Sequence, residues 1–233
     1  MDRGCGSQPA FVRTEPGAQA PAVSELLPGE DFAVLEYAGG WAWGFCRADH
    51  VVGYVEAIAL AEPIAPTHIV CEKEAPVAPD DRITSPIIAH LPMGSLLHGR
   101  ECGACLATEY GCVALSHLRA LAEAGGDPVA LAERLKGAPW LDGGRSAAGI
   151  DATGLVQLAL AVSGVKAPRL ADQLALFGAT ATGPAERGDI VLGDDVAGLM
   201  IDDLMMIHAS RPAGKVVVEP LLLHANTERR RPV

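Results

Sequence analysis

Aromatic side chains are scarce in this chain, where Phe, Trp and Tyr make up 4% of 233 residues. Hydrophobic residues still reach 49% and charged residues 20%, which predicts a packed core of small aliphatic side chains and excludes intrinsic disorder. Basic residues are also few, with 18 Lys and Arg against 29 Asp and Glu and a formal net charge of −11. Because an acidic surface repels phosphate backbones, we expect no nucleic-acid partner. The one basic run, at 229–231, is expected to be a solvated tail.

Long apolar runs are missing as well. No segment approaches the ~20 apolar residues of a membrane-spanning helix, and residues 1–17 lack the apolar core of a secretory signal. We therefore expect no membrane partner and a cytoplasmic location. All six cysteines lie before residue 113 and are expected to be reduced there. Residues 113–233 contain no cysteine, which excludes a cysteine nucleophile from that part of the chain.

Short strands separated by glycine turns dominate the first part of the chain. Three stretches have the alternating or apolar pattern of such strands: 31–37, 41–45 and 51–55. Closely spaced strands of this length predict a small barrel. The runs Gly40-Trp-Ala-Trp-Gly44 and Val52-Gly-Tyr-Val55 resemble a bacterial SH3-like domain. We predict a barrel of this type at residues 8–64.

A second stretch of the same type follows a linker marked by Pro63 and Pro66. Its apolar segments are again short and interrupted by glycine, as expected of strands in a small all-β unit. We predict a second SH3-like barrel at residues 65–122, although its sequence motif is less clear than that of the first.

The pair Cys102-Gly-Ala-Cys105 allows two interpretations. Gly103-Ala104 suits a two-residue hairpin turn, which would place the two cysteines opposite each other as ordinary strand residues. The alternative is a zinc site that also uses Cys112 and His117. We favour the hairpin, and for the whole chain we expect neither a metal nor a cofactor.

The pattern changes after Gly126, from short strands to helices followed by strands. Asp127-Pro128 combines a helix cap with proline at the first helical position, which predicts a helix that ends at Gly137. Residues 152–163 are apolar nearly all round, which predicts a buried central helix. Four apolar stretches then predict an antiparallel sheet: 189–192, 198–201, 205–208 and 215–219. This order of elements is typical of an α+β domain.

Three motifs of this domain resemble the signature of the NlpC-type cell-wall cysteine peptidases and occur in the family's order. They are Gly143-Gly144 with Gly149-Ile-Asp-Ala-Thr-Gly-Leu155, then Arg187-Gly-Asp-Ile-Val191, then Met206-Ile-His-Ala209. The resemblance implies a papain-like α+β domain at 124–233. It also implies a catalytic cysteine at the start of the buried helix, where the helix dipole favours the thiolate. A histidine base and a third polar residue would lie on the strands.

The residues at the catalytic positions depart from this pattern. Ala152 stands where the family has its cysteine, and Val196 stands where it has its histidine base. The third polar position, twelve residues after the base, is His208. Without a base-activated nucleophile no acyl-enzyme forms, so no intact catalytic set is expected. The alternative for His208 is a core histidine whose ring is satisfied by hydrogen bonds.

Three further residues are candidate ligand contacts: Trp140, Asp151 and Thr153. The resemblance implies that Asp151 faces the free amine of a peptide substrate, but an aspartate here also suits the N-cap of the helix. At the edges of the site, Asp142 and Leu170-Ala171 replace residues with which the family lines its pocket or holds the peptide.

Together these features predict a catalytically inactive homologue of a γ-D-glutamyl-diamino-acid endopeptidase. Its role would be to bind a muropeptide or a protein partner. Two other classes remain open. One is an active cell-wall cysteine peptidase whose site is misread or mutated, and the other is a purely structural subunit. An open cleft without a paired nucleophile and histidine would favour the binding protein, and a filled cleft would favour the structural subunit.

Overall fold

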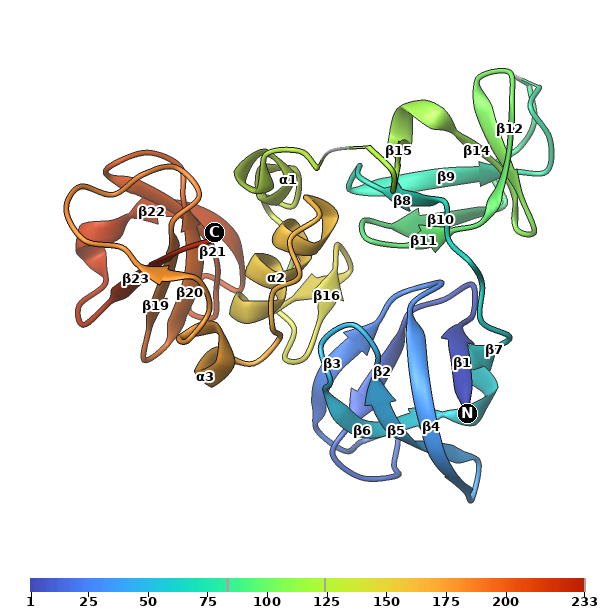
Figure 1. The fold of residues 1–233 in the computed structure, drawn as a ribbon, viewed down its shortest axis with the longest axis horizontal. Coiled ribbons are helices and arrows are strands. Elements are labelled where there is room, and N and C mark those ends of the chain that lie inside the picture. Colours follow the sequence, from blue (N-terminus) through green and yellow to red (C-terminus); the bar gives the residue numbers. More distant parts are fainter. Residues whose placement is uncertain (83, 124, 233) are drawn as a thin grey trace. The chain divides into compact units, whose positions relative to one another are not determined.

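The computed structural model describes residues 1–82, 84–123 and 125–232. The chain divides into two compact units, Met1–Ala124 and Gly125–Val233, each with elements of its own (Figure 1). None of the helices in the described ranges has the length and apolar character that crossing a membrane requires.

The first part of the N-terminal unit is an antiparallel sheet of seven strands in the order β3-β2-β6-β5-β4-β1-β7. The elements are β1 (Asp2–Cys5), β2 (Ala10–Arg13), β3 (Ala22–Leu26), β4 (Asp31–Ala38), β5 (Trp41–Cys46), β6 (Val52–Glu56), the short helix η1 (Ala57–Ala59) and β7 (Leu60–Ala61). The close pairing of β4 and β5 needs glycine at position 44, since a Cβ there would lie 2.0 Å from the Ala33 carbonyl oxygen. Strand β1 lies before the predicted boundary at residue 8, yet it pairs with β4 and β7, so this sheet begins at Asp2.

The second part of this unit has two smaller antiparallel sheets, in the orders β10-β9-β14-β13-β12 and β11-β8-β15. The elements are β8 (His68–Val70), β9 (Glu74–Ala78), β10 (Ala89–Pro92), β11 (Leu96–Leu97), β12 (Gly99–Cys102), β13 (Cys105–Thr108), β14 (Gly111–Ala114), η2 (Leu115–His117) and β15 (Leu118–Ala120). They enclose a separate apolar core that includes Val70, Leu91 and Leu106. That this part is a second SH3-like barrel stays a prediction.

The hairpin interpretation of the Cys102–Cys105 segment is confirmed. Strands β12 and β13 are joined at Gly103-Ala104, and Cys102 pairs with Cys105 across the ladder. Gly103 has a φ of +60°, which an L residue with a side chain seldom adopts. None of the six cysteines, all of which lie in the described ranges, forms a disulfide.

The C-terminal unit places its helices before its main sheet. The helices are α1 (Pro128–Arg134), α2 (Ala152–Val162), α3 (Ala171–Leu174) and the short η3 (Leu221–Leu223). A two-stranded ladder of β16 (Arg145–Ser146) and β17 (Gly149–Ile150) precedes α2. Six antiparallel strands follow in the order β18-β23-β19-β20-β21-β22. Their bounds are β18 (Ala179–Thr180), β19 (Ile190–Gly193), β20 (Val196–Met200), β21 (Met205–Ser210), β22 (Lys215–Pro220) and β23 (Glu228–Arg231).

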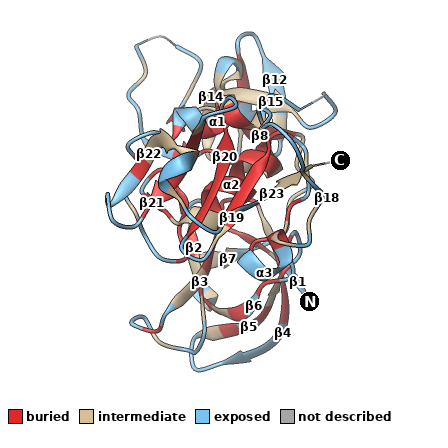
Figure 2. Ribbon diagram, turned by 90° about the vertical axis from the view of Figure 1, so that its left-hand side faces the viewer, coloured by how far each residue is buried: buried red, intermediate tan, exposed pale blue. Residues whose placement is uncertain are grey.

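Helix α2 forms the centre of this unit, as its apolar sequence predicts. Leu155, Val156 and Leu160 are fully buried, and the helix contacts α1, β20 and β21. Figure 2 shows α2 and β20 largely in the colour of buried residues. The helix ends because Gly164 takes a φ of +92°, which lets the Val165 N–H donate to the Leu160 carbonyl in a Schellman motif.

The basic run 229–231 is not a solvated tail, so that expectation is wrong. It forms β23 and pairs with β18 and β19 at the edge of the sheet. Asp189 explains why the run is held there, because its buried carboxylate accepts hydrogen bonds from Arg229 and from Arg231 at 2.7–3.0 Å. Burial by itself would raise the pKa of Asp189. The hydrogen bonds from Arg231 and from the Glu186 N–H outweigh it and lower the pKa below its ordinary value.

Asp189 therefore links stability to pH. Because its pKa is lower in the folded state, its contribution is present above the unfolded pKa of ~3.9 and is lost as pH falls through the folded value. Removing one partner of a buried ion pair costs ~3–5 kcal/mol, and partial exposure of Arg231 reduces the expected cost of Asp189→Asn to ~2 kcal/mol. Urea unfolding between pH 7 and pH 2 checks this. The variant should be less stable at pH 7 and should lose less stability in acid than the natural chain.

The control is Asp195→Asn, at an exposed position. We expect it to keep both the stability and the acid dependence of the natural chain. Equal acid dependence in Asp189→Asn and the natural chain would show that the Asp189 ion pairs contribute nothing to this linkage.

Candidate functional site

A pocket of about 1480 Å³ opens in the C-terminal unit. Its wall combines the first turn of α2, residues of β20, β21 and β22, and the loops next to these strands. Five of the six site residues predicted from the sequence line it: Trp140, Ala152, Thr153, Val196 and His208. The sixth, Asp151, is not part of the wall and has a different role.

Two apolar side chains occupy the part of the wall where the family resemblance places nucleophile and base. Ala152 is the first residue of α2, at the positive end of the helix dipole, where a thiol would be acidified. It offers only a methyl group. Val196 is the first residue of β20 and lines the same pocket with an isopropyl group. Neither side chain can attack a carbonyl or accept a proton.

The Asp151 carboxylate closes a network at the start of α2. One oxygen accepts from the Gly154 N–H at 2.7 Å, which makes Asp151 the N-cap, and the other accepts from the Gly143 N–H at 2.9 Å. The second oxygen also accepts from Arg169 Nη2 at 2.6 Å, and Arg169 is only 2% exposed. The hydroxyl of Thr153 is held in the same network, between Asp151 and Arg169. The cap interpretation of Asp151 is thus confirmed, while contact of Asp151 or Thr153 with a ligand stays a prediction.

His208 is 2% exposed and lies on β21 at the wall of the pocket. Its Nε2 lies 3.0 Å from Glu219 Oε2. Its Nδ1 is buried and meets no partner with hydrogen-bond geometry among the described residues, and the alternative of a satisfied core histidine stays open. Burial lowers the pKa of His208, and the hydrogen bond to Glu219 opposes this without reversing it. The neutral imidazole is therefore favoured at neutral pH.

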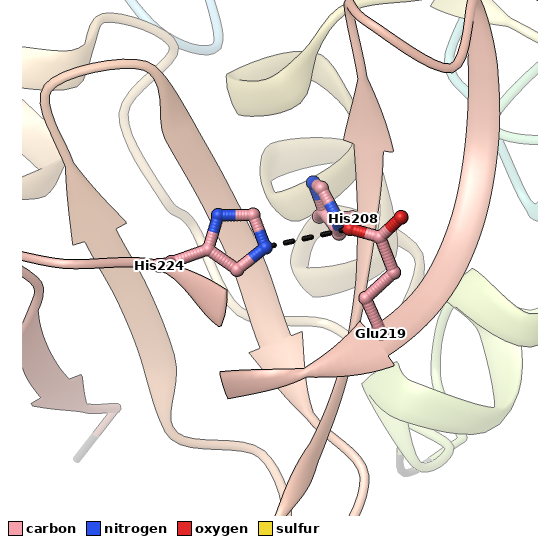
Figure 3. A group of neighbouring side chains, drawn as sticks. All are labelled: His208, Glu219 and His224. Atoms are coloured by element: carbon pink, nitrogen blue, oxygen red, sulfur yellow. Dashed lines mark hydrogen bonds and ion pairs between the residues drawn. The ribbon is translucent and has the colours of Figure 1, made fainter. Parts of the chain in front are cut away.

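Glu219 and His224 complete a cluster with His208, although no sequence motif indicated either residue. Figure 3 shows the side chains of Glu219 and His224 pointing toward His208. In the ladder of β21 and β22, His208 pairs with Val217, so Glu219 is its diagonal neighbour on the same face of the sheet. His224 follows η3, and its ring meets that of His208 edge to face with the centroids 4.9 Å apart. Only the strand register and the turn after β22 bring these residues together.

The pocket is acidic. Its wall carries five carboxylate side chains: Asp172, Asp194, Asp195, Glu219 and Glu228. Arg211 is the single Arg or Lys residue in the described wall, and its guanidinium lies 5.1 Å from the centre of the Trp140 ring while also pairing with Asp142. Trp140 therefore already stacks with a cation of the chain itself. The remaining charges favour a cationic ligand over an anionic one.

Comparisons with known proteins identify relatives of both units. Residues 137–229 match the model of the NlpC/P60 family, and residues 12–60 match the model of the bacterial dipeptidyl-peptidase SH3 domain. No curated protein sequence matches the chain.

Solved structures with the same fold cover nearly the whole chain. An NlpC/P60 family protein from Bacillus cereus ATCC 10987 has a TM-score of 0.83 and 14% identity, with 99% of each chain covered. An NlpC/P60 endopeptidase from Photobacterium damselae subsp. piscicida has a TM-score of 0.60 and 12% identity, covering 97% of this chain and 65% of its own. NlpC2 from Trichomonas vaginalis has a TM-score of 0.51 and 16% identity, covering 99% and 96%. At these identities the likeness shows a shared fold.

The Asp151 network yields a test of its structural role. Asp151→Ala removes an N-cap worth ~1 kcal/mol and leaves the buried Arg169 guanidinium without its carboxylate, which typically costs ~3–5 kcal/mol. We expect the free energy of unfolding to fall by at least ~3 kcal/mol. Urea unfolding followed by the helical circular dichroism signal measures this, because α1, α2 and α3 all belong to the C-terminal unit.

The matched control is Asp142→Ala. Asp142 pairs with Arg211 at the surface, where such an ion pair is worth at most ~1 kcal/mol. If Asp151→Ala destabilises the chain no more than this control, the carboxylate is not what holds the start of α2.

Proposed function

We propose that the chain is a non-hydrolysing binding protein of the NlpC/P60 family, because residues 137–229 match the model of that family and residues 12–60 match that of a bacterial SH3 domain. Its ligand would be a short cell-wall peptide that enters the C-terminal pocket through a positively charged amino group. The observation that carries the proposal is the pair Ala152 and Val196, which lines the pocket where a nucleophile and a base would have to stand.

The remaining hydroxyl near this position does not replace the missing thiol. The Oγ1 of Thr153 is engaged by Arg169 and Asp151, and no histidine belongs to this network in the described structure. A hydroxyl is a weak nucleophile unless an adjacent base takes its proton. Cysteine chemistry from elsewhere in the C-terminal unit is also excluded, since residues 113–233 contain no cysteine.

The volume and the charge of the pocket favour binding over a purely structural role. A structural subunit would be expected to fill this space with side chains, whereas about 1480 Å³ remains open. The five carboxylates of the wall would attract the amino groups of a peptide that contains a diamino acid. A lysine-rich segment of a protein partner offers the same chemistry and is the competing ligand.

We expect no hydrolysis of a peptide of the type L-Ala-γ-D-Glu-diamino acid, and measurable binding of the same peptide. Mass spectrometry after prolonged incubation measures cleavage, and calorimetry measures binding. Affinity should fall with salt, and Asp195→Asn should weaken it about threefold, since one exposed charge contributes up to ~1 kcal/mol. Asp203→Asn, at another exposed position, is the control.

Cleavage and binding test different parts of the proposal. Turnover above that of buffer, repeated with an independently purified sample, would contradict the non-hydrolysing role. Absence of binding at millimolar peptide would not contradict the non-hydrolysing role. It would reject the cell-wall peptide as the ligand.

We further expect that Ala152→Cys alone does not create peptidase activity. A lone thiol of pKa ~8.5 is only a few per cent thiolate at neutral pH, and the helix dipole lowers this pKa only in part. Val196 would still supply no acid or base, a function worth ~10²–10⁴-fold in rate. Adding Val196→His should restore little, because Asp142, Leu170 and Ala171 remain where the family has groups that hold the peptide.

The experiment compares the natural chain, the single variant and the double variant on one peptide. Iodoacetamide labelling read by mass spectrometry at residue 152 reports the thiolate fraction. The control thiol is Ala213→Cys, which lines the same pocket away from a helix start and should react more slowly. A double variant as fast as an active family member would show that the peptide site is intact and that only the two catalytic side chains were lost.

A further inference from the structure

The cluster of His208, Glu219 and His224 has the composition and spacing of a metal site. Glu219 Oε2 lies 3.0 Å from His208 Nε2 and 3.4 Å from His224 Nε2, and no two of the three atoms are more than 4.8 Å apart. Two imidazoles and a carboxylate with a fourth position left open form one of the recurring ligand sets of zinc. Figure 3 shows the three side chains converging on one point from β21, β22 and the segment after η3.

We propose that these three residues bind a divalent transition-metal ion, with zinc as the best match. Zinc–nitrogen and zinc–oxygen bonds of ~2.0–2.2 Å in a tetrahedron place neighbouring ligand atoms ~3.3–3.5 Å apart. The two pairs that share Glu219 are already close to that spacing. The pair of His208 and His224 is at most ~1.5 Å wider than a tetrahedral edge, a gap that a small rotation of the His224 ring closes.

The surroundings of the cluster also favour a cation. The Nε2 atom of His224 is buried and forms no hydrogen bond with any described residue, although it lies 3.4 Å from Glu219 Oε2. A metal ion between these two atoms would bind both. The other carboxylates of the wall, such as Asp194 and Glu228, add negative charge that attracts a cation into the pocket. A mixed set of imidazole and carboxylate ligands suits zinc better than magnesium or calcium, which prefer oxygen ligands.

The open coordination position would face the pocket, because all three ligands belong to its wall. Water or a carboxylate of the bound ligand would complete the coordination. Such a site would contradict the sequence-based expectation that the chain holds no metal. It is also separate from the zinc alternative considered for Cys102, Cys105, Cys112 and His117, since it lies wholly in the C-terminal unit.

The test uses the full chain after treatment with a chelator, and no peptide is present, so its outcome is independent of the proposed peptide binding. Competition with a zinc-binding dye measures stoichiometry and affinity. We expect one zinc ion on this site, and we expect Glu219→Gln and His224→Gln each to weaken its binding ~100-fold or more, since even residues that only support metal ligands contribute ~10–100-fold. The matched controls are Glu228→Gln, on the same pocket wall, and His90→Gln, at an exposed position of β10. His90→Gln should bind zinc as the natural chain does, and Glu228→Gln should weaken binding less than about fivefold, since a charge that does not ligate the ion contributes at most ~1 kcal/mol.

Cysteines are the competing ligands, because six free thiols lie in the N-terminal unit. Cobalt(II) substitution of the natural chain separates the two sites without any variant. A visible spectrum of four-coordinate cobalt without a thiolate charge-transfer band supports the histidine and glutamate site. A strong thiolate band, or zinc binding that survives Glu219→Gln and disappears in Cys102→Ser/Cys105→Ser, would assign the ion to the cysteines and overturn the proposal. Absence of zinc binding at micromolar concentration would also overturn it.

Discussion

The pocket depends on the interactions of the Asp151 carboxylate. This carboxylate caps α2, accepts from the Gly143 N–H in the preceding turn, and neutralises the buried Arg169. A buried guanidinium without a carboxylate partner is strongly destabilising, so the loop of Arg169, the glycine turn and the helix start are held as one assembly. The position of Ala152 at the wall follows from this assembly. The assembly places the side chain of the first helical residue at the pocket wall, and that side chain is a methyl group.

The fold of α2 does not depend on a reactive side chain at its first position. The forces that hold α2 are the burial of its apolar faces, its N-cap and its Schellman motif, and none of them involves a nucleophile. They hold the helix in place with the methyl group of Ala152 at its first position. The stability of α2 is therefore separable from the chemistry of the side chain at position 152.

The cluster of His208, Glu219 and His224 combines one residue of a sequence motif with two residues from outside the motifs. His208 is a member of the motif that the family resemblance implies, but its partners in this chain come from β22 and from the segment after η3. The hairpin register puts Glu219 diagonally beside His208 on one face of the sheet. The turn after β22 then brings His224 within 3.4 Å of the same carboxylate oxygen.

Local patterns in the sequence were sufficient for helices α1 and α2 and for strands β19, β20, β21 and β22. Asp127-Pro128, the apolar helix from residue 152 and the turn at Gly103-Ala104 each act through neighbouring residues, so their outcome can be predicted from a short window. Tertiary structure alone decided three other features. Arg229 and Arg231 are ordered because they reach a buried Asp189 some forty residues away. The Asp151 carboxylate is engaged by Arg169, and Glu219 and His224 converge on His208. In each case the partners are set by strand register and by burial of charge, which depend on the whole fold and leave no local signal in the sequence.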